Sequence, residues 1–259
     1  MPDLLEHADH RRGKARRLPV RAVLFDLDGT LADTAGDLAA ALNRVRADRA
    51  LPALPLATLR PQASHGARGL LAAGFGIDRE HADFAALRDA FLGYYASALC
   101  EHTRLFPGAC QVLDEIERRG LRWGIVTNKA ARFTLPVVDR LALTARAGAV
   151  ICGDTTPQSK PHPAPLLAGA AALSAEPAHC VYVGDAERDI IAGRAAGMHT
   201  LFAAYGYIGV DETPTAWKPD GALDSLPSLL DWLPLAVAAD PPGSAAPAER
   251  AISPGTTRR

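Results

Sequence analysis

Two aspartates, Asp26 and Asp28, stand one residue apart directly after the apolar run of residues 23–25. Such a run predicts a buried strand, which Gly29 then ends. Because parallel strands present their functional groups at the carboxyl edge of a sheet, both acids should enter a crevice there. Two carboxylates roughly 4 Å apart repel each other by about 4 kcal/mol at an effective dielectric constant near 20. The pair therefore favours a cation beside it, and a hard divalent metal with oxygen ligands fits best.

Taken alone, this tetrapeptide of Asp, Leu, Asp and Gly fits a strand followed by an acidic turn equally well. Three further motifs with polar residues occur later in the chain. Thr127 follows residues 123–126, Lys160 lies in a proline-rich loop, and Asp185 and Asp189 follow another apolar run. Each of them could be an ordinary solvated loop residue. Their appearance together and in this order is far more specific than any one of them.

This order of motifs resembles that of the haloacid-dehalogenase-type (HAD) phosphatases. The resemblance implies that Asp26 is a nucleophile that forms an aspartyl-phosphate. It implies a Mg²⁺ ion on the Asp26 carboxylate, the backbone carbonyl of Asp28 and the Asp185 carboxylate. The side chain of Asp28 is then the expected general acid for the leaving alcohol and the later general base for water. An aspartate at this position favours phosphoryl transfer over dehalogenation, because a halide leaving group needs no proton.

The resemblance also gives roles to the remaining motif residues. Thr127 and the backbone N–H of Asn128 are expected to hold phosphoryl oxygens. Lys160 is expected to offset the negative charge that grows on phosphorus. Asp189 is expected to orient Lys160 or a metal-bound water rather than to bind the metal itself.

A sheet must hold these side chains, and strand and helix patterns alternate where they occur. A helix is expected at residues 109–119, with strands at 122–127, 149–152, 180–183 and 199–203. This alternation predicts an α/β fold, a doubly wound parallel sheet with helices on both faces. It matches the Rossmann-like HAD core. The chain has no GxGxxG motif after a strand and no Walker lysine motif, so dinucleotide or P-loop chemistry is unsupported.

Between the first and second motifs the chain shows helical periodicity, with apolar faces in residues 37–51 and 84–99. An all-helical insertion at this place resembles the cap of the HAD subgroup that includes the phosphoglycolate phosphatases. A cap of this kind closes over the crevice and excludes water. The expected division is a core of residues 19–33 and 105–235 with an inserted all-helical cap of residues 34–104.

One loop of the expected cap, residues 63–69, contains glycines and three polar side chains that could reach the crevice. Ser64, His65 and Arg68 are therefore candidate substrate-binding residues. Arg68 could meet a substrate carboxylate through a bidentate pair. A turn between helices with a solvated arginine explains the same residues equally well.

The two ends of the chain differ from its middle. Residues 7–17 are basic and aperiodic, and the chain beyond about residue 239 is rich in Pro, Ala, Gly, Ser and Arg. Disorder is therefore expected for an extension at residues 1–18 and for a tail at residues 236–259. The extension lacks the apolar region and cleavage site of a targeting peptide, and a start codon assigned too far upstream would also explain it.

Composition excludes several classes of protein. The chain has 259 residues, 48% of them hydrophobic, and a formal net charge of −1. That is ample for a globular core, and it gives no electrostatic reason to expect nucleic acid or a membrane surface as a partner. No apolar run approaches the roughly 20 residues of a spanning helix. The four cysteines lack CxxC spacing and suit the reducing cytoplasm, where we expect the protein to work.

The expected function is a Mg²⁺-dependent phosphomonoesterase for a small phosphorylated metabolite, acting as a monomer or homodimer. Phrases such as VTNK and VGDAERDI resemble the bacterial phosphoglycolate phosphatases, so hydrolysis of 2-phosphoglycolate is expected. They fit the N-acetylmuramic acid 6-phosphate phosphatases at least as well, because the core motifs contact only the phosphoryl group. A small cavity with Arg68 aimed at a carboxylate would favour the first substrate, and a roomy cavity the second.

Two other classes of protein remain as alternatives. A sugar phosphomutase shares every core motif, and it would keep the aspartyl-phosphate long enough to rephosphorylate a bound sugar. A regulatory binding module on an inactive phosphatase fold is disfavoured, because such a module has no use for Asp28 as a proton donor.

Overall fold

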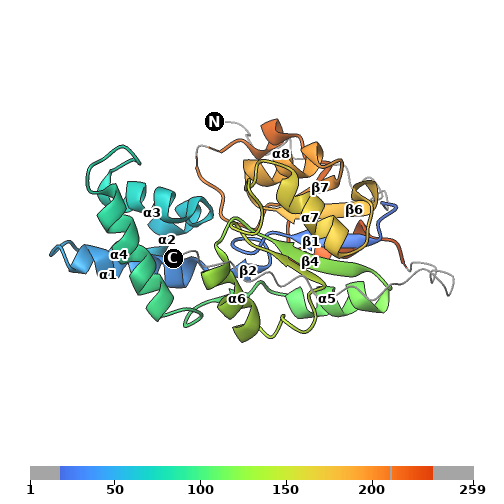
Figure 1. Ribbon diagram of the computed structural model, residues 1–259, viewed down its shortest axis with the longest axis horizontal. Helices are drawn as coiled ribbons and strands as arrows, with labels where there is room; N and C mark the ends of the chain where they lie inside the picture. Colours follow the sequence, from blue (N-terminus) through green and yellow to red (C-terminus); the bar gives the residue numbers. More distant parts are fainter. Residues whose placement is uncertain (1–17, 211, 236–259) are drawn as a thin grey trace, which may run out of the picture.

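A six-stranded parallel sheet lies at the centre of the molecule in a computed structural model that describes residues 18–210 and 212–235 (Figure 1). The strand order is β5-β4-β1-β6-β7-β8, so the first strand lies in the middle of the sheet and later strands are added on both sides of it. The strands are β1 Ala22–Phe25, β4 Arg122–Val126, β5 Ala149–Ile151, β6 Cys180–Gly184, β7 His199–Ala203 and β8 Gly221–Leu223. This confirms the predicted doubly wound α/β fold.

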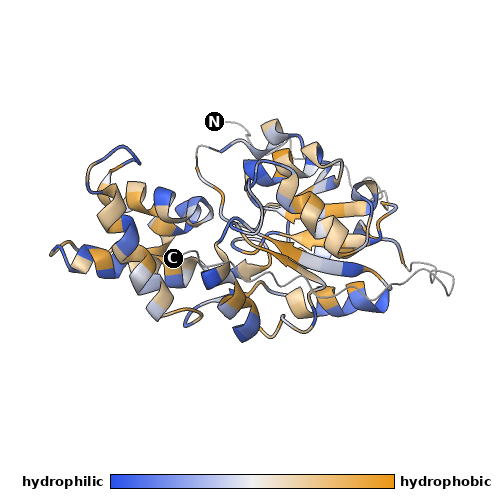
Figure 2. Ribbon diagram, viewed as in Figure 1, coloured by the Kyte–Doolittle hydropathy of each residue, from blue (hydrophilic) through white to orange (hydrophobic). Residues whose placement is uncertain are grey.

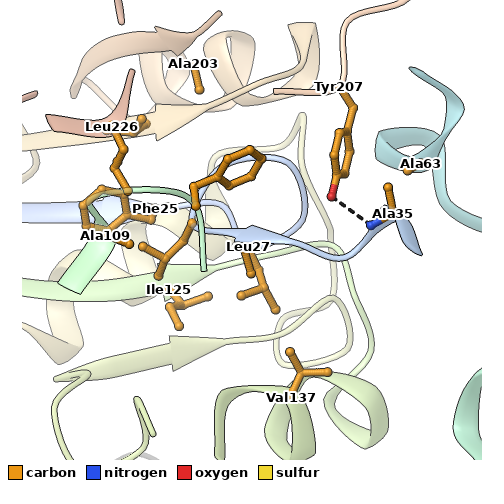
Figure 3. Close-up of a cluster of buried hydrophobic side chains, with 14 of the residues drawn as sticks. Phe25, Leu27, Ala35, Ala63, Ala109, Ile125, Val137, Ala203, Tyr207 and Leu226 are labelled. Carbon is orange, nitrogen blue, oxygen red and sulfur yellow. Dashed lines mark hydrogen bonds between the residues drawn. The ribbon is translucent and has the colours of Figure 1, made fainter. Parts of the chain in front are cut away.

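Helices cover both faces of the sheet, with α5 and α6 on one side and α7 and α8 on the other (Figure 1). Alternate residues of β1 serve the two faces. Val23 and Phe25 belong to the larger apolar cluster, with α5 and α6, while Ala22 and Leu24 belong to the smaller one, with α7 and α8. Figure 3 shows Phe25 and Ile125 within the larger cluster. The bounds are α5 Ala109–Arg118, α6 Ala131–Arg140, α7 Ala164–Ala172 and α8 Glu187–Ala195.

A separate group of helices lies to one side of the sheet, at the left in Figure 1. We call residues 34–104 the cap segment. The chain enters and leaves it through a short antiparallel pair of strands, β2 Ala32–Asp33 and β3 Arg104–Leu105. Its helices are α1 Ala35–Ala47, α2 Leu56–Leu59, the 3₁₀ helix Arg60–His65, α3 Gly66–Phe75 and α4 Phe84–Ser97.

The short elements were not predicted. β2, β3 and β8 have two or three residues each, too few to show a period of two in the sequence. Four 3₁₀ helices were also missed, namely Arg60–His65, Pro177–His179, Pro214–Trp217 and Leu226–Asp231. Strands β1, β4, β5, β6 and β7 and helices α1, α4 and α5 were predicted to within a few residues at each end. Helices α2, α3 and α6 were not predicted. Residues 63–69, expected to form a loop, instead complete the 3₁₀ helix Arg60–His65 and begin α3.

Most of the two predicted disordered ends, residues 1–17 and 236–259, lies outside the described residues. Leu18, placed in the N-terminal extension by the prediction, is buried, and its N–H donates to the Trp232 carbonyl at 2.9 Å. Apolar residues are concentrated in the sheet and the inner faces of its helices (Figure 2). Within residues 18–210 and 212–235, no helix combines the length and the apolar character needed to cross a membrane.

Candidate active site

The polar motifs come together at the carboxyl edge of the sheet because three neighbouring strands end in register there. Phe25, the last residue of β1, pairs with Ile125 of β4 and with Val183 of β6. Strands β4 and β6 each end one residue after this pair. Asp26, Thr127 and Asp185 follow these three strands and are almost fully buried. Their shared position follows from parallel topology.

A glycine allows two of these segments to approach each other. Gly29 has a φ of +82°, and a Cβ at this position would collide with the Asp185 carboxylate and the Tyr207 ring. Only glycine adopts this conformation without strain and leaves room for the acid. The glycine that ends the first motif thus permits the contact between the β1 and β6 loops.

Three buried carboxylates form a cluster, since Asp26, Asp185 and Asp189 each offer an oxygen atom within 4.8 Å of the others. Burial, followed by the charges of Asp26 and Asp189, raises the pKa of Asp185 to about 8. Burial also raises the pKa of Asp26, against the opposing effect of Lys160. Both shifts have burial as their largest cause, because burial disfavours the charged form of a carboxyl group.

One oxygen of the cluster is available for a cation. Asp185 Oδ2 accepts hydrogen bonds from Ser64 Oγ at 2.6 Å and from the Tyr207 N–H at 2.9 Å. Asp185 Oδ1 is buried and has no hydrogen-bond partner in the part of the chain that the structure describes. An unpartnered buried carboxylate oxygen beside two further acids fits a hard metal ion with oxygen ligands.

Lys160 lies beside this cluster and is 3% exposed. Its Nζ is 3.0 Å from Asp26 Oδ1 and 2.7 Å from Asp189 Oδ1. The same ammonium group donates to the Val126 carbonyl at 3.0 Å and to the Tyr182 hydroxyl at 2.7 Å. These partners fix the lysine next to Asp26, and Asp189 contacts it directly, in the arrangement predicted for an orienting residue.

The side chains of Asn128 and Thr127 make different hydrogen bonds. The Asn128 side chain donates to the Lys160 carbonyl at 2.8 Å and accepts the Lys160 N–H at 2.9 Å. Its side chain therefore clamps the backbone that carries the lysine. Thr127 Oγ1 accepts the Lys129 N–H at 3.2 Å, and both residues line the cleft described next.

A cleft of about 1170 Å³ separates the sheet edge from the cap segment. Asp26, Asp28, Thr127, Asn128 and Lys160 contribute to its wall on the sheet side. On the cap side its wall includes all three predicted cap residues and several aromatic and basic side chains: Ser64, His65, Arg68, Arg79, Arg88, Phe91 and Tyr95. The structure thus brings these predicted residues of the core and the cap to one cavity, whereas Asp185 and Asp189 are fully buried and do not line it.

The three predicted cap residues differ in what they contact. Ser64 bonds Asp185, as given above, and Arg188 Nη2 donates to the Ser64 carbonyl at 2.7 Å. His65 Nε2 is 3.6 Å from Glu212 Oε1, and burial together with Arg188 lowers the pKa of His65. Arg68 is exposed on the cleft wall. Of the three, Arg68 has the freedom to meet a substrate.

Sequence reasoning missed three residues that contact the site. Tyr182 bonds Lys160, Arg188 links the site to the cap segment, and Lys129 Nζ lies 2.9 Å from Asp28 Oδ1. Lys129 and Arg188 are neighbours of motif residues, and their charge could have marked them. Tyr182 could not have been found in this way, because an aromatic residue within an apolar strand is expected to belong to the hydrophobic core.

Comparison with known proteins agrees with this fold and site. The family described as haloacid dehalogenase-like hydrolase matches residues 23–203, and the chain belongs to that family. A crystal structure of a predicted phosphoglycolate phosphatase from Haemophilus somnus 129PT superposes with a TM-score of 0.72 at 26% identity. That match covers 82% of this chain and 97% of the other.

Two groups of curated relatives are similar to the chain to the same degree. N-acetylmuramic acid 6-phosphate phosphatase of Pseudomonas putida is 42% identical over 205 residues, which are 79% of this chain and 92% of the relative. Phosphoglycolate phosphatase of Xanthomonas campestris pv. campestris is 43% identical over 220 residues, which are 83% of this chain and 96% of the relative. Overall similarity therefore does not separate the two activities.

Proposed function

We propose that this chain is a Mg²⁺-dependent phosphomonoesterase that works through an aspartyl-phosphate on Asp26 and hydrolyses 2-phosphoglycolate to glycolate and phosphate. The observation that carries the proposed chemistry is the buried Lys160, held between Asp26 and Asp189. The choice of 2-phosphoglycolate is supported by the similarity to a curated phosphoglycolate phosphatase. An isolated lysine in such a place would be costly to bury, and the carboxylates make it a fixed positive charge beside the expected nucleophile.

The metal would be held by the carboxylates of Asp26 and Asp185 and by the backbone carbonyl of Asp28. Support comes from the unpartnered Asp185 Oδ1 and from the raised pKa of both acids, which a cation would reverse. When bound, Mg²⁺ would neutralise negative charge on the phosphate and on the attacking carboxylate. Asp189 remains an orienting residue for Lys160 in this proposal.

The side chains of the chain divide the reaction into two steps. In the first, an Asp26 carboxylate oxygen forms a bond to phosphorus while the ester P–O bond breaks and Asp28 gives its proton to the leaving oxygen. In the second, Asp28 takes a proton from water, whose oxygen bonds to phosphorus as the Asp26–phosphorus bond breaks. Lys160, Thr127 and the Asn128 N–H stabilise the phosphoryl oxygens in both steps.

A second substrate, N-acetylmuramic acid 6-phosphate, is favoured by one observation. The cleft of about 1170 Å³ is much larger than a two-carbon acid requires. Both substrates carry a carboxylate in addition to the phosphate, so an exposed Arg68 could pair with either. The size of the cleft therefore favours binding of the sugar phosphate. Tight binding of the smaller 2-phosphoglycolate would require the cap segment to close over it.

The proposal includes a cytoplasmic enzyme that needs neither nucleic acid nor a membrane. The four cysteines are free, and Cys152 and Cys180 are buried. The partner proposed for the cleft is a small phosphorylated metabolite. The protein is predicted to act as a monomer or a homodimer.

A phosphate-release assay with Mg²⁺ tests the substrate, with 2-phosphoglycolate, N-acetylmuramic acid 6-phosphate and common hexose phosphates compared side by side. A hundredfold preference in kcat/KM, about 2.7 kcal/mol of differential transition-state binding, would identify the substrate. Asp26→Asn, purified in parallel, controls for contaminating phosphatases. Isomerisation of a hexose phosphate without phosphate release would contradict the phosphatase and favour the phosphomutase.

A further inference from the structure

Lys129 is buried at the boundary between the core and the cap segment, and the proposed reaction does not yet use it. Its side chain is 8% exposed, and its Nζ lies 2.9 Å from Asp28 Oδ1. On the other side the ammonium group lies over the ring of Tyr95, 4.6 Å from the ring centroid. Tyr95 belongs to α4, so one lysine contacts both the expected proton donor and a helix of the cap segment.

The partners of Asp28 restrict how its carboxyl group can turn. Thr34 Oγ1 donates to Asp28 Oδ1 at 2.6 Å, and Lys129 Nζ reaches the same oxygen at 2.9 Å. Both donors contact Oδ1, so this oxygen of the carboxyl group is held in place. The proton passed to a leaving group would then be carried by the other oxygen, Oδ2. The Asp28 side chain lines the cleft.

Lys129 is expected to carry its positive charge in this position. Burial acts to lower the pKa of Lys129, but the Asp28 carboxylate and Tyr95 more than compensate, so the pKa lies above its usual value. A buried ammonium group beside a carboxylate gives a strong, directional hydrogen bond. Such a bond costs little reorganisation during the reaction, because both groups are already in place.

We propose that Lys129 is a positioning residue for the general acid: it fixes Asp28 Oδ1 so that Oδ2 faces the leaving oxygen, and it stabilises the carboxylate that proton donation leaves behind. This inference depends on the proposed phosphatase reaction. In that reaction the ester P–O bond breaks and the Asp26–phosphorus bond forms, while the proton moves from Asp28 to the leaving oxygen. Lys129 exchanges no proton, and acts only through Asp28.

Two other roles for Lys129 make different predictions. A lysine that binds the phosphoryl group would matter for every phosphate monoester, and so would a lysine that only supports the fold. A lysine that acts through a proton donor matters when the leaving group needs a proton. Alkoxides need one, whereas 4-nitrophenolate is stable as an anion near neutral pH and needs almost none.

The test compares kcat/KM for an alkyl phosphate with kcat/KM for 4-nitrophenyl phosphate, since this parameter covers the steps up to phosphorylation of Asp26. For Lys129→Met we expect a loss of about 30-fold or more with the alkyl phosphate and of less than about threefold with the aryl phosphate. Asp28→Asn provides the reference pattern for a lost proton donor. Lys218→Met, the same change at an exposed lysine, should leave both values unchanged.

A double mutant adds an independent result. If Lys129 acts through Asp28, adding Lys129→Met to Asp28→Asn should cost less than threefold further with the alkyl phosphate. Additive losses would overturn the inference, and so would equal losses of the single mutant on both substrates. Circular dichroism and thermal unfolding verify the fold, and Lys129→Gln replaces the methionine variant if that one does not fold.

The wild-type protein separates this inference from the proposal on which it rests. Wild-type enzyme that hydrolyses neither substrate with Mg²⁺ would contradict the phosphatase itself. Wild-type enzyme that hydrolyses both, with Lys129→Met equally impaired on each, would contradict only the role of Lys129.

Discussion

The sheet edge and the cap segment form opposite walls of one cleft, but they hold their side chains very differently. At the sheet edge Asp26, Lys160 and Asp185 are buried. The ammonium group of Lys160 contacts four polar groups. On the cap wall Arg68, Arg79 and Arg88 are exposed. Rigid, buried groups suit a reaction that must be the same for every substrate, and exposed groups suit recognition that can vary.

Relatives with two different substrate names are almost equally similar to the chain. In the proposed reaction, residues of the core motifs contact the phosphoryl group, which both candidate substrates carry. The walls meet where Ser64 bonds Asp185 and where Lys129 lies over Tyr95. We expect core substitutions to impair all substrates together and cap substitutions to impair them selectively.

The largest effect should come from Asp26→Asn. The change removes the nucleophile and keeps the shape of the side chain, so kcat should fall by about 10⁴-fold or more with every substrate. Initial rates of phosphate release measure this. Asp139→Asn, at an exposed position of α6, is the matched control. A variant that retained more than a tenth of wild-type turnover would end the covalent mechanism.

Lys160→Met should be the most destabilising change at the sheet edge. It leaves the buried carboxylates of Asp26 and Asp189 without their cation, which should lower the free energy of unfolding by about 3 kcal/mol at pH 8 in EDTA. Because burial raises the pKa of Asp26, proton uptake should make the loss smaller at pH 5. Urea unfolding measures both values, and Lys218→Met should change neither by more than about 0.5 kcal/mol.

Mg²⁺ should stabilise the protein more at pH 8 than at pH 5. The metal-free folded protein keeps a proton on Asp185 up to about pH 8, whereas the unfolded chain loses it near the ordinary pKa of 3.8. Raising the pH through that interval therefore lowers the free energy of unfolding, and a metal that requires the carboxylate must displace the proton at low pH.

Thermal unfolding with and without Mg²⁺ measures this difference. At a concentration 100 times Kd the expected stabilisation is about 2.7 kcal/mol. Asp185→Asn should abolish both the response to Mg²⁺ and its pH dependence. An equal response at the two pH values would show that the ion does not bind at Asp185.

The smallest and most selective effect should come from Arg68→Ala in the cap segment. If Arg68 pairs with a substrate carboxylate, KM for 2-phosphoglycolate should rise about tenfold while kcat changes little. Hydrolysis of 4-nitrophenyl phosphate, which has no carboxylate, should be unaffected. Arg118→Ala, an exposed arginine on α5, serves as control. An equal loss with both substrates would place Arg68 in the shared machinery and weaken the contrast between the walls.

The sheet and its polar edge were predictable because each motif follows an uninterrupted apolar run. Parallel topology then brings Asp26, Thr127 and Asp185 to one place without further information. The contacts of Asn128 and Lys129 were not predictable. Lys129 reaches Asp28 because β1 pairs with β4 in one particular register, and a sequence pattern does not encode that register.

The cap segment was predictable in type but not in its contacts. Apolar periodicity predicted α1 and α4, whereas the position of the 3₁₀ helix that carries Ser64 depends on how these helices pack. Ser64 lines the cleft, and its bond to Asp185 was not predicted. Short elements such as β2 and β3, which connect the cap segment to the core, leave no periodic signal at all.

The most direct test of the proposed chemistry is to trap the phosphorylated enzyme. In Asp28→Asn the residue that activates water is lost, so the aspartyl-phosphate formed from 4-nitrophenyl phosphate should accumulate. After an acid quench, peptide mass spectrometry should find one phosphoryl group, located on Asp26. Phosphate release that continues with no phosphorylated peptide, or a phosphoryl group on any other residue, would contradict Asp26 as the nucleophile.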